Sequence, residues 1–402
     1  MALGWNISNE DFFTDSKAEK LISSLKLRAS YGKNGNEAVS GAYVTLPNLN
    51  TFNYLTDDHK PMYGFYPVKL ASPNLGWETT TSFNTGLDFG LLAGRIQGSF
   101  DMYWSNTSDL LLSRTIPTIN GTSTLLDNVG KTSNNGWEFQ VTSTNINNKD
   151  FTWNTTLNMV HYNSKIKNVG LFDENGNPAD DVASRWFIGH PVGSNYDYVF
   201  NGIWQITNPD NPNGAQDPNY PNSIPGYMKY EDNDGEVGIT TADRRIIGRS
   251  LPDITIGMMN MLSYKNVSLS FFINSQFGQT ARNYLKDVNS NSYAQNKMMI
   301  EFWTPDNPIN TYPKNQLNSG VNPEGAGFYE KTDFIRLQDV TLSYKFPKSI
   351  LGKTGIERFE VYTNLKNIYT WTNWTGLDPE FIGSQRAAPQ LGSVVLGVKF
   401  DF

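Results

Sequence analysis

The sequence predicts an all-β protein whose strands form a transmembrane antiparallel β-barrel. Three observations support this. Apolar and polar residues alternate strictly in repeated segments, connections between these segments are alternately short and long, and no apolar run reaches the roughly 18 residues that a membrane helix needs. The 402 residues are 38% hydrophobic and 13% aromatic. This composition permits strands that expose one apolar and one polar face.

Charge and cysteine content exclude several classes of function. The net charge is −7, and lysine and arginine are dispersed along the chain, whereas nucleic-acid binders concentrate positive charge in a stripe. We therefore expect no nucleic-acid partner. The absence of cysteine excludes disulfides, thiolate metal sites and cysteine nucleophiles.

The alternation is clearest in the last residues of the chain. Val394, Leu396, Val398, Phe400 and Phe402 fall on one face of a strand, because side chains point to opposite faces in turn. The same pattern recurs along the sequence and predicts eleven strands, at residues 2–7, 25–33, 79–90, 95–112, 135–146, 151–164, 254–264, 267–277, 331–346, 356–371 and 391–402. Short helices are expected near residues 16–24 and 280–300.

The connections alternate in length after the first helical segment. Short links are predicted at 91–94, 147–150, 265–266 and 347–355, and long ones at 34–78, 113–134, 165–253, 278–330 and 372–390. A meander with this parity places all short turns on one rim and all long loops on the other. Outer-membrane barrels have this arrangement, with short periplasmic turns and longer extracellular loops. We therefore expect 165–253 to be a long extracellular loop region.

Alternation alone does not distinguish a soluble sheet from a membrane barrel. Long strands and aromatic residues at strand ends, such as Trp104, Trp137, Phe346 and Phe402, favour the membrane, where aromatic girdles mark both interfaces. A soluble or surface carbohydrate-binding β protein and an outer-membrane barrel enzyme remain as alternatives. The enzyme is disfavoured because no nucleophile elbow, P-loop or HExxH motif occurs.

Several stretches, in order along nearly the whole chain, resemble one family. They are LKLRASYGKNGN (25–36), NLGWETTTSFNTGLDFGLLAGRIQGSFDMYWSNTSDLLL (74–112), VGKTSNNGWEFQVTSTN (129–145), GSNYDYVFNGIW (193–204), DRRIIGRSLPDITIG (243–257), FIRLQDVTLSYKFP (334–347), FEVYTNLKNIYTWTNWTGLDPE (359–380) and the final GVKFDF. With these motifs the chain is similar to the C-terminal part of the SusC/RagA type of TonB-linked outer-membrane transporters of Bacteroidetes.

The resemblance implies a multi-pass protein of the bacterial outer membrane that is not an enzyme. It implies that residues 1–402 are the C-terminal half of a 22-stranded barrel, with the plug domain and signal peptide absent. Because lipid cannot satisfy the open edges of a half-barrel, we expect the chain to be a fragment. It further implies import of oligosaccharides or peptides, energy from TonB through the missing N-terminal part, and a SusD-like lipoprotein as a lid.

The segment YEDNDGEVGITTAD (230–243) has the spacing of a calcium loop. Counted from Asp232 as position 1, Asp234, Glu236, Gly238 and Asp243 occupy positions 3, 5, 7 and 12. Alternating acidic residues supply the oxygens that Ca²⁺ requires. However, Val237 occupies position 6, where the sharp turn needs glycine. A solvated acidic loop without metal is the alternative, and no other cofactor is expected.

Aromatic residues in the long loops are candidates for solute binding, because their faces can stack on sugars or hold peptide side chains. The alternative is that they hold the loops together or contact a lid partner. The candidates are Tyr54, Tyr63, Phe65, Tyr66, Trp303, Tyr312 and Trp374.

Charged residues on the predicted polar faces are expected to pair across strands, or to contact a solute or plug inside the barrel. They are Arg28, Asp88, Asp101, Glu138, Lys345, Glu360, Lys366, Lys399 and Asp401. Phe402 is predicted to be the terminal aromatic signal that the assembly machinery recognises in barrels resembling this one, or simply the last lipid-facing residue of its strand.

Overall fold

The computed structural model describes residues 1–402 except 38–42, 287–299, 316–318, 353–354 and 383–389. Eleven long strands form one antiparallel sheet in the order β1-β2-β5-β6-β7-β8-β13-β14-β17-β18-β19. Strands that follow one another along the chain are neighbours in this order, apart from short strands within the long loops. The prediction of a meander of eleven strands is confirmed.

The observed strands lie close to the predicted ranges. The sheet consists of β1 (Ala2–Asn6), β2 (Ile22–Asn36), β5 (Glu78–Leu91), β6 (Ile96–Thr115), β7 (Thr124–Asn147), β8 (Phe151–Asn168), β13 (Ile254–Tyr264), β14 (Val267–Phe277), β17 (Phe334–Lys345), β18 (Arg358–Thr372) and β19 (Ser393–Asp401). Several strands exceed ten residues, more than most strands of soluble sheets. Within the described residues, none of the helices has the length and apolar character that a bilayer span requires.

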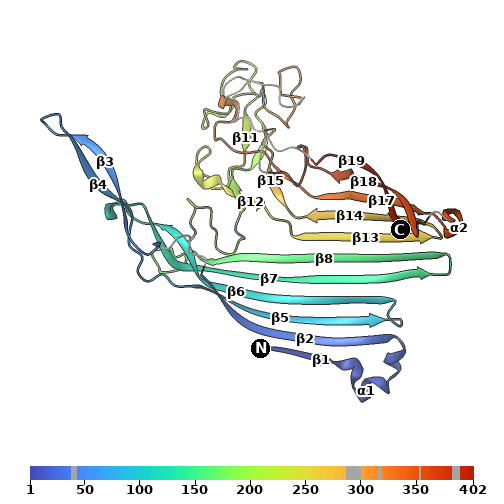
Figure 1. The fold of residues 1–402 in the computed structure, drawn as a ribbon. Coiled ribbons are helices and arrows are strands. Elements are labelled where there is room, and N and C mark those ends of the chain that lie inside the picture. Colours follow the sequence, from blue (N-terminus) through green and yellow to red (C-terminus); the bar gives the residue numbers. More distant parts are fainter. Residues whose placement is uncertain (38–42, 287–299, 316–318, 353–354, 383–389) are drawn as a thin grey trace. The chain divides into compact units, whose positions relative to one another are not determined.

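The chain divides into two compact units. Unit 1 contains Met1–Asn145 and Thr155–Val192, and unit 2 contains Ile146–Asn154 and Gly193–Phe402. In unit 1, β1, β2, β5, β6 and β7 lie side by side (Figure 1). The turn between β5 and β6 is short, and Leu92, Ala93 and Gly94 adopt positive φ there.

The predicted helix at 16–24 is only partly correct. The structure has a short helix α1 (Asp11–Thr14) and a 3-10 helix at Lys17–Lys20, and β2 already begins at Ile22. The side chain of Ser16 accepts a hydrogen bond from the backbone N–H of Ala18 and so caps the 3-10 helix. Cross-strand pairing with β5 then imposes extended backbone from Ile22 onward.

β6 and β7 continue beyond their predicted ends as a two-stranded ribbon. β7 starts at Thr124, so the loop predicted at 113–134 is reduced to residues 116–123. The register shifts twice between Thr107 and Leu111, and Asp109 between them has φ of 59°. Bulges interrupt the period-2 pattern. The shifts lie opposite Asn128 and Gly130, in the part of β7 that the predicted strand 135–146 leaves out.

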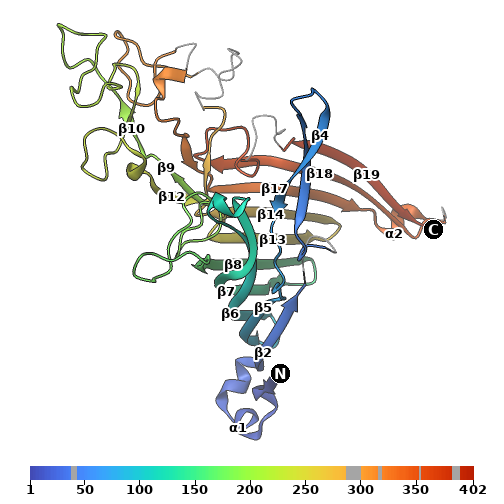
Figure 2. The ribbon, with the colours of Figure 1, turned by 90° about the vertical axis from the view of Figure 1, so that its left-hand side faces the viewer.

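The long connection between β2 and β5 forms its own hairpin. β3 (Asn48–Leu55) and β4 (Pro61–Lys69) pair with each other in a separate two-stranded sheet. Figure 2 shows this hairpin standing away from the strands of unit 1.

Unit 2 combines β13, β14, β17, β18 and β19 with folded long loops. A two-residue turn joins β13 to β14, and helix α2 (Lys348–Leu351) lies in the connection to β18. The loops add β9 (Ser194–Asp197), β10 (Phe200–Ile203), β11 (Met228–Tyr230), β12 (Arg245–Arg249), β15 (Thr280–Arg282) and β16 (Tyr329–Lys331), with 3-10 helices at Thr241–Asp243 and Ser319–Val321. Unit 1 has further 3-10 helices at Ile7–Asn9 and Thr118–Asn120.

The helix predicted at 280–300 is not found in its described part, because Thr280–Arg282 form strand β15, paired with β16. Residues 287–299 lie outside the described part of the chain. The short strands gather beyond one end of β13 and β14 (Figure 2). The long loops of unit 2 are therefore a packed structure rather than extended connections.

Candidate functional site

The polar face of unit 1 carries a row of residues in register across five strands. Gly4 faces Arg28, Arg28 faces Gly86, Gly86 faces Asp101, and Asp101 faces Glu138. Arg28 donates hydrogen bonds to both carboxylate oxygens of Asp88, at 2.9 and 2.8 Å, and to Asp101 at 3.0 Å. Cross-strand charge pairing is confirmed here.

Glycine at position 86 permits this arrangement. A Cβ atom there would lie 2.2 Å from Oδ1 of Asp101 and 2.8 Å from Nη2 of Arg28. The guanidinium group therefore lies across the glycine to reach carboxylates on two strands. Any side chain at Gly86 would displace Arg28 from this position.

A second charged row crosses unit 2. Lys345 faces Glu360, and Glu360 faces Lys399, so that the charge alternates in sign across β17, β18 and β19. Arg358 also pairs with Glu360 at 2.5 Å. Opposite charges in neighbouring strands stabilise the sheet, so these residues need no solute to explain them.

The opposite face of the strands is apolar and exposed. In unit 2, Val394, Leu396, Val398 and Phe400 on β19 are exposed, and Phe402 is 80% exposed. A hollow of about 590 Å³ lies on this face between Leu342, Val361 and Leu396. Its lining is mainly aliphatic and aromatic, with Thr363 between Leu342 and Leu396 and without a charged residue among the lining residues, so we assign the hollow to lipid contact rather than to a solute.

Aromatic residues mark two levels of the apolar face in unit 2. Near the long-loop rim, the rings of Tyr369 and Trp371 are 4.8 Å apart. Near the short-turn rim, Phe346 lies 4.9 Å from both Tyr344 and Phe359. Phe359 and Tyr369 are ten residues apart on β18. At about 3.4 Å per residue and a strand tilt of about 40°, the two aromatic levels are separated by about 25 Å along the membrane normal, which is the height of a barrel's apolar band.

The long loops of unit 2 enclose a hydrophobic core, which we call the loop core. It consists of Tyr198, Ile203, Met228, Tyr230, Trp303, Val321, Ala326 and Phe328. Trp303, 5% exposed, donates a hydrogen bond from its indole N–H to Gln205 at 2.8 Å. Tyr312 packs against the same core and stacks on Phe328 at 5.5 Å. Both predicted solute-binding residues thus have a packing role.

Buried tyrosines add polar connections to the loop core. The Tyr230 hydroxyl donates to Asn322, and the Tyr220 hydroxyl donates to Glu324 at 2.9 Å. Burial raises the pKa of Tyr230 and of Tyr220 well above the usual tyrosine value. Both hydroxyls therefore stay protonated and act as donors.

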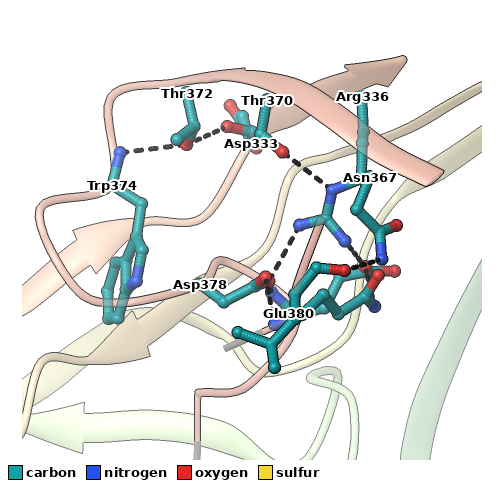
Figure 3. Close-up of polar contacts among 10 residues, drawn as sticks. Asp333, Arg336, Asn367, Thr370, Thr372, Trp374, Asp378 and Glu380 are labelled. Atoms are coloured by element: carbon teal, nitrogen blue, oxygen red, sulfur yellow. Dashed lines mark hydrogen bonds and ion pairs between the residues drawn. The ribbon is translucent and has the colours of Figure 1, made fainter. Parts of the chain in front are cut away.

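A buried ionic cluster, the Arg336 cluster, fixes the loop that follows β18. Arg336 is 1% exposed, and its Nε donates to Thr370 at 2.8 Å while its Nη2 donates to Asp378 at 2.9 Å. The other terminal nitrogen pairs with Glu380 (Figure 3). One guanidinium on β17 thereby holds two carboxylates from the loop.

Trp374 belongs to the same loop and is buried. Its backbone N–H donates to the Thr372 hydroxyl at 3.0 Å, and that hydroxyl donates to the carbonyl of Asp333 at 2.7 Å (Figure 3). Trp374 thus joins Trp303 and Tyr312 among the candidates that the structure places inside packed loops. Whether any of the three contacts solute stays a prediction.

A second ionic cluster surrounds Glu330 on β16. The Glu330 carboxylate accepts three hydrogen bonds: from the ammonium group of Lys286 at 2.6 Å, from the hydroxyl of Thr375 at 2.8 Å and from the side-chain amide of Asn283 at 3.3 Å. Burial raises the pKa of Glu330, but the hydrogen bonds from Lys286 and Thr375 outweigh it and hold the pKa below the usual value. The cluster ties two long loops together.

Sequence reasoning missed both ionic clusters. Arg336 sits among apolar residues in FIRLQDV, and the acidic pair of LDPE lies two residues apart just after an aromatic loop. An isolated arginine within an apolar strand segment is a signal of buried pairing, since a buried charge requires a partner. Which carboxylate it meets, however, depends on the path of the loop.

The β3–β4 hairpin exposes its aromatic residues. Tyr63 is 70% exposed and Phe65 67%, and both lie on the face opposite to that of Phe52, Tyr54 and Tyr66. Phe52 lies about 6 Å from both Tyr54 and Tyr66. The candidates Tyr54, Tyr63, Phe65 and Tyr66 are thus brought onto one element, but on its two faces.

The acidic loop brings together three of its five predicted calcium ligands. One carboxylate oxygen from each of Asp232, Asp234 and Asp243 lies within 4.8 Å of the others, and the Glu236 carboxylate does not belong to this group. The backbone carbonyl of Gly238 stays a predicted ligand. Positive φ angles occur at Gly235 and Gly238, not at Val237. The calcium-loop numbering requires a sharp turn at position 6, Val237, whereas the observed sharp turns lie before and after it, at Gly235 and Gly238.

Backbone amides already bind the buried member of this group. The Asp243 carboxylate accepts hydrogen bonds from the N–H groups of Thr240 at 2.7 Å, Asn233 at 2.6 Å and Asp234 at 3.3 Å. Burial raises the pKa of Asp243, but these hydrogen bonds together lower it by more, so the pKa lies below its usual value. The loop is therefore ordered by its own hydrogen bonds, and calcium binding stays a prediction.

Comparison with known proteins defines the family. The model of the TonB dependent receptor-like β-barrel matches residues 3–368. The TonB-dependent receptor P3 of Formosa agariphila is 33% identical over 94% of this chain and 38% of its own length. The TonB-dependent receptor SusC of Bacteroides thetaiotaomicron is 27% identical over 100% of this chain and 40% of its own. The chain thus spans about two fifths of these relatives.

Solved structures give the same fold. The RagAB peptide importer in its open-open state superposes with a TM-score of 0.75 at 25% identity, covering 100% of this chain and 42% of the other. The RagAB peptide transporter gives 0.74 at the same identity. The family comprises outer-membrane receptors and transporters rather than enzymes or soluble carbohydrate-binding proteins, so neither alternative from the sequence is supported. The chain belongs to the TonB-dependent receptor β-barrel family and is an outer-membrane β-barrel protein of the SusC/RagA type.

Proposed function

We propose that this chain supplies wall and long loops to an outer-membrane importer of oligosaccharides or peptides. The main support is the two-faced wall: paired charges run in register across β2, β5 and β6 on one face, while the other face is apolar and exposed. A wall of this kind separates a watery passage from lipid. The oligosaccharide or peptide class rests on similarity to SusC and to the RagAB peptide importer.

Uptake by cells tests this proposal. A strain lacking the gene should lose uptake of one labelled oligosaccharide or peptide pool and regain it with the wild-type gene. Collapse of the proton-motive force should abolish uptake as well, because TonB draws its energy from the inner membrane. Unchanged uptake of every pool in the deletion strain would contradict an import function.

We further propose that the β3–β4 hairpin contacts a SusD-like lipoprotein. Its apolar residues occupy both faces, whereas a small solute needs a single concave wall. Exposed tyrosine and phenylalanine side chains are typical anchors of protein interfaces. In this proposal Tyr63 and Phe65 bury their rings against the partner.

Co-purification of the lipoprotein tests this contact. The double substitution Tyr63→Ala with Phe65→Ala should weaken the complex by about 30-fold or more, since two interface anchors each contribute about 1–2 kcal/mol. Ile119→Ala is the control, because Ile119 is an even more exposed apolar residue at the tip of the β6–β7 ribbon. If the double variant retains the partner as the control does, the hairpin is not the contact.

Calcium binding by the acidic loop is a separate proposal. Asp232, Asp234 and Asp243 converge, and carboxylate oxygens are the ligands that Ca²⁺ prefers. Calorimetric titration of the purified protein with Ca²⁺ should give a heat of binding that Asp232→Asn removes and that Asp210→Asn, an exposed acid outside the group, retains. If no heat is measured at millimolar Ca²⁺, the loop binds no calcium and is ordered by its hydrogen bonds alone.

A further inference from the structure

The apolar face of unit 2 is hollowed at its long-loop rim. A cavity of about 440 Å³, which we call the rim hollow, opens between the ends of β14, β17 and β18. On the outward side it is lined by Phe277, Asp333, Ile335, Tyr369, Trp371 and Asn373. The lining also includes Phe334, Thr370 and Thr372, and Thr370 is the residue that binds Arg336 on the other face of the same strands. No residue of the loop core lines the hollow.

Strand register establishes which face the hollow occupies. Ile335 is paired with Trp371 and Leu337 with Tyr369, so these four side chains share a face. Arg336 is paired with Thr370 on the opposite face, where Asp378 and Glu380 cover it. Trp371 and Tyr369 remain 52% and 57% exposed on the face that continues downward as the lipid-contacting wall.

The lining changes from apolar to polar along the strands. Below the hollow, the same face carries Leu337, Val340 and Leu365. At the level of the hollow it carries the two aromatic rings, and at the upper edge Asp333 and Asn373. Long loops of this class of barrel face the outside of the cell, so this gradient lies at the outer leaflet, between hydrocarbon and headgroups.

The side chains at the upper edge determine which headgroup fits. Asp333 and Asn373 offer a carboxylate and an amide to hydroxyl groups, and Trp371 offers a flat aromatic face. Among the described residues that line the hollow there is no lysine or arginine, and the carboxylate would repel a phosphate. Aromatic stacking together with hydroxyl recognition is the chemistry of a neutral sugar.

We propose that the rim hollow binds the sugar headgroup of an outer-leaflet glycolipid, with its acyl chains lying along Leu337, Val340 and Leu365. The occupant follows from continuity with the lipid-contacting wall, since a ligand at this level must be apolar below and polar above. Asp333 accepts a hydrogen bond from the backbone N–H of Gly278 at 2.7 Å, which holds its carboxylate at the edge of the hollow. The proposal rests on the outer-membrane location and not on import.

Two amphiphiles with the same twelve-carbon chain test the headgroup. The receptor is purified from outer membranes in lauryldimethylamine oxide and titrated with dodecyl maltoside or with dodecylphosphocholine, and native mass spectrometry counts the retained molecules. The wild type should retain the maltoside and not the phosphocholine. Equal retention of both would show a site for hydrocarbon only and would overturn sugar recognition.

Substitutions locate the site. Trp371→Leu keeps an apolar surface but removes the stacking face, and should weaken maltoside retention by about tenfold. Trp104→Leu is the matched control, because Trp104 is an exposed tryptophan on the same kind of face in unit 1, stacked on Phe83. Heat-modifiable gel mobility verifies that both variants are folded. Equal retention by Trp371→Leu and the wild type would place the maltoside elsewhere and refute the rim hollow as its site.

Discussion

The β3–β4 hairpin and the loop core both come from long loops rich in aromatic residues, yet they use them differently. In the hairpin, the rings of Tyr63 and Phe65 lie on the surface. In the loop core, Trp303 and Tyr230 are enclosed by residues from two loops and hydrogen-bond to Gln205 and Asn322. A two-stranded hairpin has too few layers to enclose a ring, whereas two long loops that fold together form a small core.

Aromatic content in a loop therefore does not by itself indicate a binding surface. Where several long loops meet, aromatic side chains are used for packing and ionic clusters fix the loops. Where one loop forms a lone hairpin, the same residue types remain available for a partner.

The largest effect is expected for the Arg336 cluster. Arg336→Ala leaves the carboxylates of Asp378 and Glu380 without their cation, and breaking a buried pair in this way costs about 3–5 kcal/mol. Hydrogen exchange should show local opening of residues 373–382 while β3–β4 remains unchanged. Arg28→Ala, in a more exposed pair, should have a much smaller effect. Equal protection in wild type and Arg336→Ala would mean that the cluster does not fix the loop.

The loop core comes next. Trp303→Ala leaves a cavity among Met228, Tyr230 and Phe328, with a cost of about 3 kcal/mol to the local free energy of opening. Tyr63→Ala in the hairpin removes an exposed ring and should cost less than about 0.5 kcal/mol. Limited proteolysis should therefore cleave the long loops of unit 2 in the first variant only. Similar resistance in both variants would remove the distinction between the two regions.

Acidic pH should loosen the loops of unit 2 through Glu330. Its pKa is lower in the folded protein than its ordinary value of 4.5, so it contributes stability above that pH and loses this contribution as pH falls through the folded-state pKa. Hydrogen exchange near Thr375, corrected for intrinsic rates, should accelerate on acidification. Glu330→Gln should make this response smaller, whereas a response of unchanged size would assign it to another carboxylate.

The smallest effect concerns the hairpin itself. A Cβ atom at Gly64 would lie 2.5 Å from the Phe52 ring, so Gly64→Ala must displace that ring from the strand. Because the ring lies at the surface and can rotate away, we expect a cost of about 1 kcal/mol or less, measured as faster exchange of β3 and β4. Gly32→Ala, in open space on β2, is the control. A large loss of protection would show that Phe52 is a core residue of the hairpin.

Much of the sheet could be predicted from the sequence, because alternation is a local property. The strands at 254–264 and 267–277 were predicted to the residue, and the order of all eleven followed from short and long connections. Prediction failed for the first residues of β7, Thr124–Asn134, which pair with β6 across two register shifts, and at Thr280–Arg282, where pairing with β16 imposed a strand on an expected helix.

The candidate sites could be predicted only in part. The charges on the polar faces were identified, since pairs such as Arg28 and Asp88 lie on neighbouring strands. The convergence of the three carboxylates of the acidic loop could also be predicted, because these residues lie close together in the sequence. The Arg336 cluster joins residues 42 and 44 positions apart through a loop whose path has no periodicity.

The amino-acid pattern alone was enough to predict a wall with an apolar and a polar face, because period-2 alternation follows from strand geometry and from the two solvents on either side. Which loop aromatics are buried and which are exposed could be read from the folded chain alone. Burial depends on how many segments meet at one place, and residues such as Trp303 and Tyr63 carry no local signal of that number. The same applies to Gly86: the sequence does not show that a side chain there would collide with Arg28, because that depends on where Arg28 lies in the folded sheet.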